Sequence, residues 1–234
     1  MPLWLAFIIT ASASVLWLQF NNFVVAKKFV SGKLSRKLIH IGTGPIFVIC
    51  WMLFPESVFS KYLAAIIPLL ISVQFFLIGI GVIKDESSVD ALTRNGDRRE
   101  ILKGPLIYGL VFVFVTIVFW RNSIVGITAL MILCGGDGLA EVVGRRAKSQ
   151  KIPWSKTKSI AGSMAMLLGG YLCSVLIAIT FNQVYAFKIS IGSVLLHLFI
   201  VNILTTIVES FPIRDLDNLT VPLTAIVAGI LLFG

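Results

Sequence analysis

Two acidic residues, Asp137 and Glu141, lie inside an otherwise apolar stretch of this chain, in the segment GGDGLAE that begins at Gly135. A charged side chain at mid-bilayer costs about 2.5 to 3.5 kcal/mol on insertion scales, so buried acids there usually have a function. Their spacing of four residues places both on one helix face, where they can share a divalent cation. A structural carboxylate pair neutralised by a lysine is the alternative.

A second polar segment, Lys151 to Ser163, combines lysines with serine and glycine at the expected start of a helix. A helix N-terminus presents unpaired N–H groups and the positive end of the helix dipole, which suits a phosphate. A basic loop with a serine cap would account for the same pattern. We expect phosphate contacts from Arg145, one turn beyond Glu141, and from the residues Lys156, Lys158, Ser159, Gly162 and Ser163.

Charged or titratable residues also occur at three other predicted helix starts. Arg36 and His40 lie four residues apart on one face and could bind an anion, although a lone histidine there is more often structural. Arg99 and Lys103 precede a Gly-Pro helix start, where arginine can hold phosphate by paired hydrogen bonds. Asp217 has the character of a helix N-cap, which explains it without chemistry.

The elements that carry these residues are apolar segments of membrane-spanning length. The chain has 234 residues, 57% of them hydrophobic, and a helix needs about 20 apolar residues to cross a bilayer core. We predict an all-α, polytopic transmembrane bundle forming one domain over residues 1–234. About seven or eight spans are expected, the second and the last being doubtful: Leu3 to Val25, Leu38 to Leu53, Tyr62 to Ile83, Pro105 to Trp120, Ser123 to Gly144, Ile160 to Phe181, Ile189 to Val208 and Leu219 to Phe233.

Basic residues are unevenly distributed among the predicted loops. The net charge is +9, and of the 20 lysines and arginines only Lys61, Arg121 and Lys188 fall in alternate loops, whereas the others, including Arg214, face one side. The positive-inside rule makes that side cytoplasmic, or stromal in a plastid. Topology alone could produce this bias. However, the polar motifs lie on the same side, so we expect the active face there.

Several catalytic motifs are absent from the sequence. It contains no G-x-x-x-x-G-K-[ST] phosphate loop, no H-E-x-x-H and no G-x-S-x-G, and no repeat typical of inverted-repeat transporters. Any nucleotide chemistry must therefore use a membrane-specific site. We expect membrane lipid around the bundle and no nucleic-acid partner.

Taken together, these motifs resemble the phytol kinase and farnesol kinase family, relatives of dolichol kinase. The resemblance runs in family order along most of the chain and rests on five motifs: Arg36-Lys37-x-x-His40, Arg99-Glu100-x-Leu102-Lys103-Gly104-Pro105-Leu106-x-Tyr108, Gly136-Asp137-Gly138-Leu139-Ala140-x-x-x-Gly144-Arg145-Arg146, Lys156-x-Lys158-Ser159-x-Ala161-Gly162-Ser163 and Asp217-Asn218-x-Thr220-Val221-Pro222. Two positions depart from the family pattern: Glu141 replaces an aspartate, and Leu216-Asp217 stands where an Asp-Asp pair is common.

The resemblance implies a kinase that transfers the γ-phosphate of a nucleoside triphosphate, typically CTP, to a long-chain isoprenoid alcohol, with phytol favoured. Mg²⁺ would be held by Asp137, Glu141 and Asp217, and Asp137 could instead orient the hydroxyl. Arg99 and Lys103 would join Asp137 and Glu141 in catalysis by neutralising transition-state charge. The lysine-serine loop would bind the nucleotide, with Arg145, Arg36 and His40 as further candidates.

Two other functions fit part of the pattern. A cytidylyltransferase would load a nucleotide onto a lipid phosphate, and a cation-coupled transporter would use Asp137 and Glu141 as its ion site without explaining the lysine-serine loop. The sequence lacks an Arg- and Ser-rich transit peptide. We therefore expect a multi-pass protein of a cyanobacterial-type bacterial inner or thylakoid membrane, or a processed plastid membrane protein.

Overall fold

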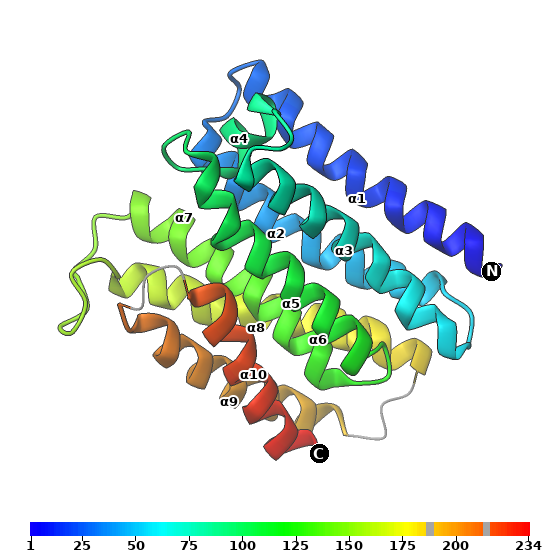
Figure 1. Ribbon diagram of the computed structural model, residues 1–234. Coiled ribbons are helices and arrows are strands. Elements are labelled where there is room, and N and C mark those ends of the chain that lie inside the picture. Colours follow the sequence, from blue (N-terminus) through cyan, green and yellow to red (C-terminus); the bar gives the residue numbers. More distant parts are fainter. Residues whose placement is uncertain (186–189, 213–215) are drawn as a thin grey trace. The chain divides into compact units, whose positions relative to one another are not determined.

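The computed structural model describes residues 1–185, 190–212 and 216–234, and helices connected by loops make up most of this part of the chain (Figure 1). Lys188 and Arg214, two of the basic residues in the charge pattern, lie outside the described residues. The elements, in which η1 and η2 are 3₁₀ turns and η3 is a π-helix, are α1 (Leu3–Ala26), α2 (Gly32–Cys50), η1 (Trp51–Leu53), α3 (Val58–Ile80), α4 (Glu86–Leu92), η2 (Arg98–Leu102), α5 (Gly104–Val118), α6 (Ile124–Met131), η3 (Ile132–Asp137), α7 (Gly138–Arg146), α8 (Ile160–Tyr185), α9 (Ile191–Ser210) and α10 (Asp217–Phe233).

Among the described residues, six helical segments are long and apolar enough to cross a membrane. They are α1, α3, η2 with α5, the continuous α6–η3–α7, α8 and α9. The expected all-α transmembrane fold is therefore confirmed. The two doubtful spans are helical as well. However, the first nine residues of α2, GKLSRKLIH, include four basic side chains (two lysines, one arginine and one histidine), and α10 has only 17 residues.

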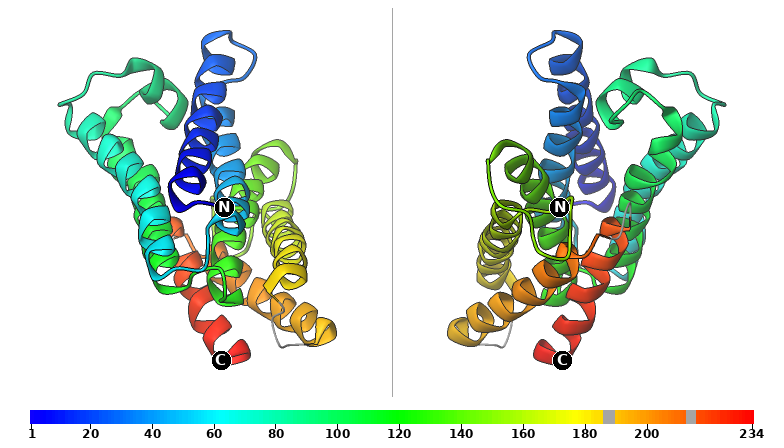
Figure 2. Two further views of the ribbon diagram at one scale, coloured as in Figure 1. Left: turned by 90° about the vertical axis from the view of Figure 1, so that its right-hand side faces the viewer. Right: turned by 90° about the vertical axis from the view of Figure 1, so that its left-hand side faces the viewer.

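The chain divides into two compact units, Met1–Ile117 and Val118–Gly234. In the first unit, α1 packs on α2 where Gly42 leaves room for the indole of Trp17. Helices α3 and α5 run side by side in the views of Figure 2, and Gly109 of α5 packs against the Ser72 hydroxyl of α3. Small residues at these positions allow close helix approach, as is common in membrane bundles.

In the second unit, the α6–η3–α7 segment is the buried element, in contact with α8, α9 and α10. Every residue from Ile124 to Ala140 except Leu139 is buried. The sequence predicted a regular helix here, whereas the structure has a π-helix over Ile132–Asp137, which ends at the first of the two acids. Wide π turns inside α-helices frequently mark functional sites, because they redirect the side chains that follow.

Glycines bring α8 against this central segment. A side chain on Gly136 would meet the Met166 sulfur at 2.8 Å, and one on Gly169 would meet the Gly135 carbonyl oxygen, also at 2.8 Å. About two turns further along this segment, Gly144 packs against Gly162 of α8. A side chain added to either glycine would lie 3.3 Å from the Cα of the other. The glycines around Asp137 therefore serve helix packing, with α8 as the close neighbour.

Candidate active site

Three carboxylates from distant parts of the second unit converge: Asp137, Glu209 and Asp217. Each offers one oxygen, and these oxygens all lie within 4.8 Å of one another. Asp137 and Glu209 are buried, and Asp217 is half-buried. Such crowding of like charges is costly in a low dielectric unless cations offset it, so the trio is a candidate cation site.

Three helix ends position these acids. Asp137 is the last residue of η3, Glu209 lies in the final turn of α9, and Asp217 is the first residue of α10. The α9 and α10 helices pack against each other, and both contact η3. Asp217 also sits at the positive end of the α10 dipole, which favours its negative charge.

Lys158 bridges two of the three acids. Its Nζ donates hydrogen bonds to Glu209 Oε1 and to Asp217 Oδ2, the latter at 2.9 Å. Burial alone would lower the pKa of Lys158, but the charges and hydrogen bonds of Glu209 and Asp217 outweigh it and raise the pKa above the ordinary lysine value. Lys158 is therefore an ammonium ion at neutral pH and a fixed positive charge at the centre.

The loop between α7 and α8 holds Lys158 in place. Lys151 and Ser159 form an isolated antiparallel bridge, and the Ile152 N–H donates to the Lys158 carbonyl at 3.2 Å. Inside this hairpin the buried Ser155 hydroxyl accepts the Lys158 N–H, also at 3.2 Å. The backbone of Lys158 is thus fixed on both sides. Lys156, two residues earlier, is exposed.

The start of α8 differs from the sequence prediction. The N–H groups of Ile160 and Ala161 donate to the Gln150 carbonyl and the Ser149 hydroxyl, at 3.0 and 3.1 Å. The next N–H, that of Gly162, donates to the Ser159 hydroxyl at 3.2 Å. The expectation that this helix start offers unpaired N–H groups to phosphate is therefore wrong, because the loop itself caps the helix.

Ser163 and Gly162, the other residues predicted to contact phosphate at the start of α8, have different environments. The Ser163 N–H donates to the Ser159 carbonyl in an ordinary helical bond, and the Ser163 hydroxyl is buried without a hydrogen-bond partner among the described residues. Gly162 is explained by its close contact with Gly144. In the segment from Lys151 to Ser163, the groups that can still attract a phosphate are therefore the lysine side chains.

Glu141 does not join the carboxylate trio. Its Oε1 pairs with Arg145 Nη2 at 2.7 Å, one turn along α7, and the Arg145 side chain is half exposed. The sequence predicted that Asp137, Glu141 and Asp217 would meet. The structure brings Asp137 and Asp217 together and puts Glu209 in the third place, because Glu209 comes from a helix that packs beside η3.

Four candidates belong to the first unit. Arg36 and His40 lie on α2, where the His40 ring packs on Tyr108 with centroids 4.4 Å apart. The His40 carbonyl also accepts the Tyr108 hydroxyl at 2.8 Å, which ties α2 to α5. Arg99, within η2, and Lys103, which follows it, are exposed. The functional roles assigned to these four residues stay predictions.

Glu209 is the residue that sequence reasoning left out of the site. A signal was present, because a carboxylate at the end of the apolar helix Ile191–Ser210 lacks a structural reason in the sequence. Its partners are 51 residues away, at Lys158, and further still, at Asp137. No local spacing links such positions, so only the packing of α9 reveals the connection.

The trio has the donor chemistry of a magnesium site. Mg²⁺ binds carboxylate oxygens at about 2.1 Å, so ligands on one ion lie within about 4 Å of each other. Small side-chain adjustments bring the trio, now within 4.8 Å, into that range. Fold and site together define a multi-span helical membrane protein with a buried, lysine-bridged carboxylate centre.

Comparisons with known proteins identify the family. The chain is 38% identical to the Triticum aestivum protein named "Probable phytol kinase, chloroplastic", over 97% of this chain and 76% of the relative. It is 39% identical to the farnesol kinase and 35% identical to phytol kinase 1 of Arabidopsis thaliana, both chloroplastic, over 97% of this chain and 75% of each relative. No family profile and no solved structure matches the chain. The chain belongs to the phytol and farnesol kinase family, and it is a kinase with an alcohol acceptor.

Proposed function

We propose that this protein is a CTP-dependent kinase that phosphorylates a long-chain isoprenoid alcohol, with phytol as substrate and phytyl phosphate as product. The observation that carries the proposal is the meeting of Asp137, Glu209, Asp217 and Lys158 in one buried centre. Phosphoryl transfer needs mainly positioning and charge neutralisation, and a cation site beside a fixed lysine provides both. The names of the relatives support the alcohol substrate.

In this proposal Asp137, Glu209 and Asp217 hold Mg²⁺. The bound ion would supply charge neutralisation on the phosphate oxygens of the nucleotide. Lys158 keeps Glu209 and Asp217 in place and contributes its own positive charge. Lys156, which is exposed in the same loop, would contact the outer phosphates. Glu141 has a supporting role in this scheme, since it holds Arg145 on the same face of α7.

The reaction is an in-line displacement at the γ-phosphorus. The alcohol oxygen forms a bond to that phosphorus while the bond to the β–γ bridging oxygen breaks, and the nucleoside diphosphate leaves. Asp137, an acid of the buried central segment, accepts the hydroxyl proton on the carboxylate oxygen that does not hold the ion. Because Asp137 belongs to the buried central helix, an alcohol that enters from the lipid would reach it with its chain among apolar side chains. Arg99, Lys103, Arg36 and His40 are kept as candidates for nucleotide and transition-state contacts on the resemblance alone.

The same comparison supports a proposal for the compartment. The relatives carry chloroplastic names, and the described part of the chain has six helices able to span a membrane. We propose a plastid membrane or a cyanobacterial-type membrane, with the active centre on the stromal or cytoplasmic side. The positive-inside bias of the loops supports this orientation.

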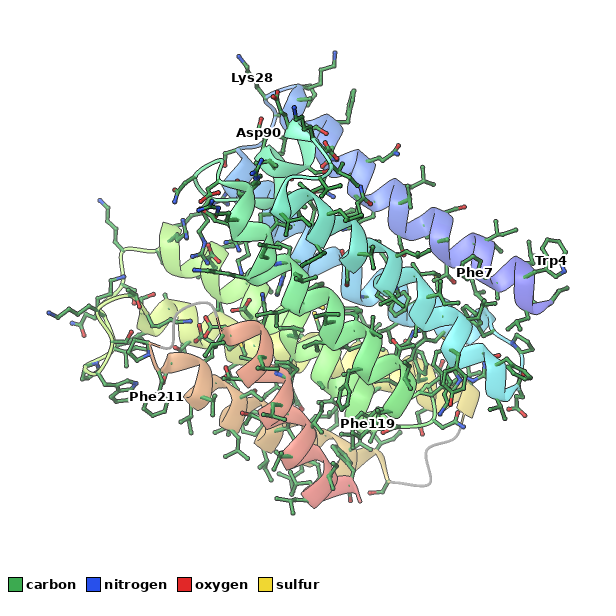
Figure 3. The ribbon with its side chains drawn as sticks, viewed as in Figure 1. Trp4, Phe7, Lys28, Asp90, Phe119 and Phe211 are labelled. Atoms are coloured by element: carbon green, nitrogen blue, oxygen red, sulfur yellow. The ribbon has the colours of Figure 1, made fainter. Side chains whose placement is uncertain are left out.

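The test is turnover by purified protein in lipid nanodiscs with Mg²⁺, a panel of alcohols, and CTP, ATP, GTP and UTP compared. Asp137→Asn and Glu209→Gln should each lower kcat by at least about 100-fold, the range typical of a lost proton acceptor or charge stabiliser. The control is Asp90→Asn, an exposed acid on α4 that Figure 3 labels, and it should be silent. Near-normal turnover by Asp137→Asn would refute the assignment.

The same preparation separates the alternatives. A kinase releases the nucleoside diphosphate, whereas a cytidylyltransferase releases pyrophosphate and needs a lipid phosphate as acceptor. Ion flux into liposomes without nucleotide would instead favour the transporter. We expect the diphosphate and phytyl phosphate, with CTP the preferred donor.

A further inference from the structure

Two aromatic side chains lie exposed beside the carboxylate centre: Trp154, in the turn of the loop hairpin, and Phe211, which follows the last residue of α9. Their exposed fractions are 57% and 45%. Figure 3 labels Phe211 at the end of α9, next to the loop that carries Lys158. Large aromatic surface left in contact with solvent or membrane at a polar site commonly marks a binding surface.

Trp154 is held in a fixed orientation. Its Nε1 donates to the Ser210 hydroxyl at 3.1 Å, and that hydroxyl donates in turn to the Ile207 carbonyl at 2.6 Å. Ser210 is buried, so the bond is partly shielded from water. The Trp154 and Phe211 rings lie 6.4 Å apart between centroids, tilted by 32°. A ring fixed in this way loses little conformational freedom when a ligand stacks on it.

This aromatic pair is coupled to the acidic centre at two points. Ser210, which anchors the indole, is the residue after Glu209 on α9. Trp154 and Lys158 share one hairpin, and Lys158 is bonded to Glu209. The loop therefore contacts the end of α9 at two adjacent residues: Trp154 bonds to Ser210, and Lys158 bonds to Glu209. An occupant that contacts both would have a flat, polarisable part and an anionic part.

We propose that Trp154 and Phe211 form the surface on which the base of the nucleotide stacks while its phosphates extend toward Lys158 and the carboxylate-bound cation. This inference rests on the proposed function and adds the base subsite to it. Every nucleobase has a π-face, and stacking on an aromatic side chain is worth about 1 to 3 kcal/mol per base, with little dependence on sequence. The hairpin is basic, carrying Lys151, Lys156 and Lys158, which suits a polyphosphate.

An interfacial membrane anchor is the competing role for an exposed tryptophan, since Trp gathers at the membrane–water boundary. The two roles predict different quenchers of Trp154 fluorescence. Nucleotide should quench it saturably if the base stacks there. Lipids brominated near the headgroup should quench it if the ring sits in the interface.

The decisive experiment measures nucleotide affinity with and without the base. In nanodiscs, Trp154→Leu should raise the KM for the nucleoside triphosphate by about 5- to 150-fold, the fold-change equivalent to about 1 to 3 kcal/mol. It should leave the KM for the alcohol and kcat within about 2-fold. Inorganic triphosphate, a competitive probe that has the phosphates but lacks a base, should inhibit wild type and variant equally.

Matched variants distinguish stacking from loop damage. Trp154→Phe keeps a ring and should retain most of the nucleotide affinity, whereas Ser210→Ala removes only the anchoring hydroxyl and should give an intermediate KM. Phe211→Leu should act in the same direction as Trp154→Leu, more weakly. Trp4→Leu, which removes an indole that is 63% exposed on α1, is the control and should change neither KM.

The outcomes separate this inference from the proposed function. If Trp154→Leu weakens nucleotide and inorganic triphosphate alike, the loop has lost its shape and the base subsite is refuted. If nucleotide KM is unchanged, or if brominated lipid and not nucleotide quenches Trp154, the ring is a membrane anchor and the inference is also refuted. In either case loss of turnover in Asp137→Asn would still support the kinase centre.

Discussion

The bridge from Lys158 to two carboxylates makes a strong prediction about stability. In Lys158→Met, a side chain of similar length keeps the apolar contacts but removes the ammonium group, so Glu209 and Asp217 stay close together without it. Glu209 is 4% exposed and Asp217 is 26% exposed at the side chain, which limits their access to water. We expect a clear loss of folding stability, and we expect Mg²⁺ to restore part of it.

The magnitude follows from distance and burial. At 2.9 Å the attraction between Lys158 and Asp217 is about 6 kcal/mol gross with an effective dielectric constant of about 20. Most of this is offset by desolvation, yet removing one partner of a buried pair costs about 3 to 5 kcal/mol because the other charge is left behind. Lys158 and Asp217 are partly exposed, so we take the lower limit, about 3 kcal/mol. At about 2 to 4 °C per kcal/mol this lowers Tm by about 6 to 12 °C.

The three cysteines of the chain provide the assay. Cys50 and Cys134 are buried and Cys173 is half-buried, and none forms a disulfide, so a maleimide dye reports their exposure on heating in detergent. Lys158→Met should unfold at lower temperature than wild type. Mg²⁺ should raise the Tm of the variant more than that of wild type, because the cation supplies positive charge that the variant has lost.

Two controls make this prediction refutable. Lys156→Met removes the same charge from an exposed position in the same loop and should shift Tm by no more than about 1 to 2 °C. Adding Glu209→Gln to Lys158→Met should recover part of the stability, because only Asp217 of the two bridged carboxylates then keeps its charge. Equal Tm values for wild type and Lys158→Met, or an equal Mg²⁺ effect in both, would show that the bridge does not hold the centre together.

Three further predictions follow from the second unit. Because the pKa of Lys158 is raised in the folded protein, its contribution to stability is complete below the pKa of lysine in the unfolded chain, near 10, and is lost only at higher pH. The difference in Tm between wild type and Lys158→Met should therefore be constant from about pH 7 to about pH 9. A difference that disappears within that range would contradict this prediction. Glu141→Gln should cost less than about 1 kcal/mol and keep most of the turnover, since the ion pair of Glu141 is with a half-exposed arginine. Loss of activity equal to that of Glu209→Gln would restore Glu141 to the metal site. The side chain added by Gly170→Val would collide with the Asn202 amide oxygen, so this variant should be destabilised by about 1 to 3 kcal/mol in the same maleimide assay. The control Gly192→Ala adds a methyl group that meets nothing within 4 Å and should be neutral or slightly stabilising. Equal Tm values for these two variants would refute the packing argument.

The membrane fold was predictable because its signal is local. Apolar runs of the length of a bilayer are visible in the sequence, and six of them appear as long apolar helices. The acids could be found by the same logic, since Asp137 stands out in an apolar run before any neighbour is known. The lysine-serine loop was likewise located from composition, and Lys158 does lie against carboxylates.

The partners of these residues were not predictable. Helical periodicity paired Asp137 with Glu141, the nearest acid along the chain, whereas the structure pairs Glu141 with Arg145 and surrounds Asp137 with acids from α9 and α10. The unpaired N–H groups expected at the start of α8 are missing for a similar reason. The N–H donors there bond to Ser149 and Gln150, which the hairpin brings back to the helix start, and helical spacing alone does not reveal such a loop contact.

The sequence by itself determined that this is a helical membrane protein, which residues carry its unusual charges and, through motif order, the kinase family to which it belongs. These properties depend on residue type and on spacing within one helix, which the covalent chain imposes. The tertiary structure alone decided that Glu209 completes the carboxylate trio, that Lys158 bridges it, and that Trp154 and Phe211 lie beside it. Such contacts join segments 50 or more residues apart, and apolar helices of similar composition give no sign of which neighbours they will pack against.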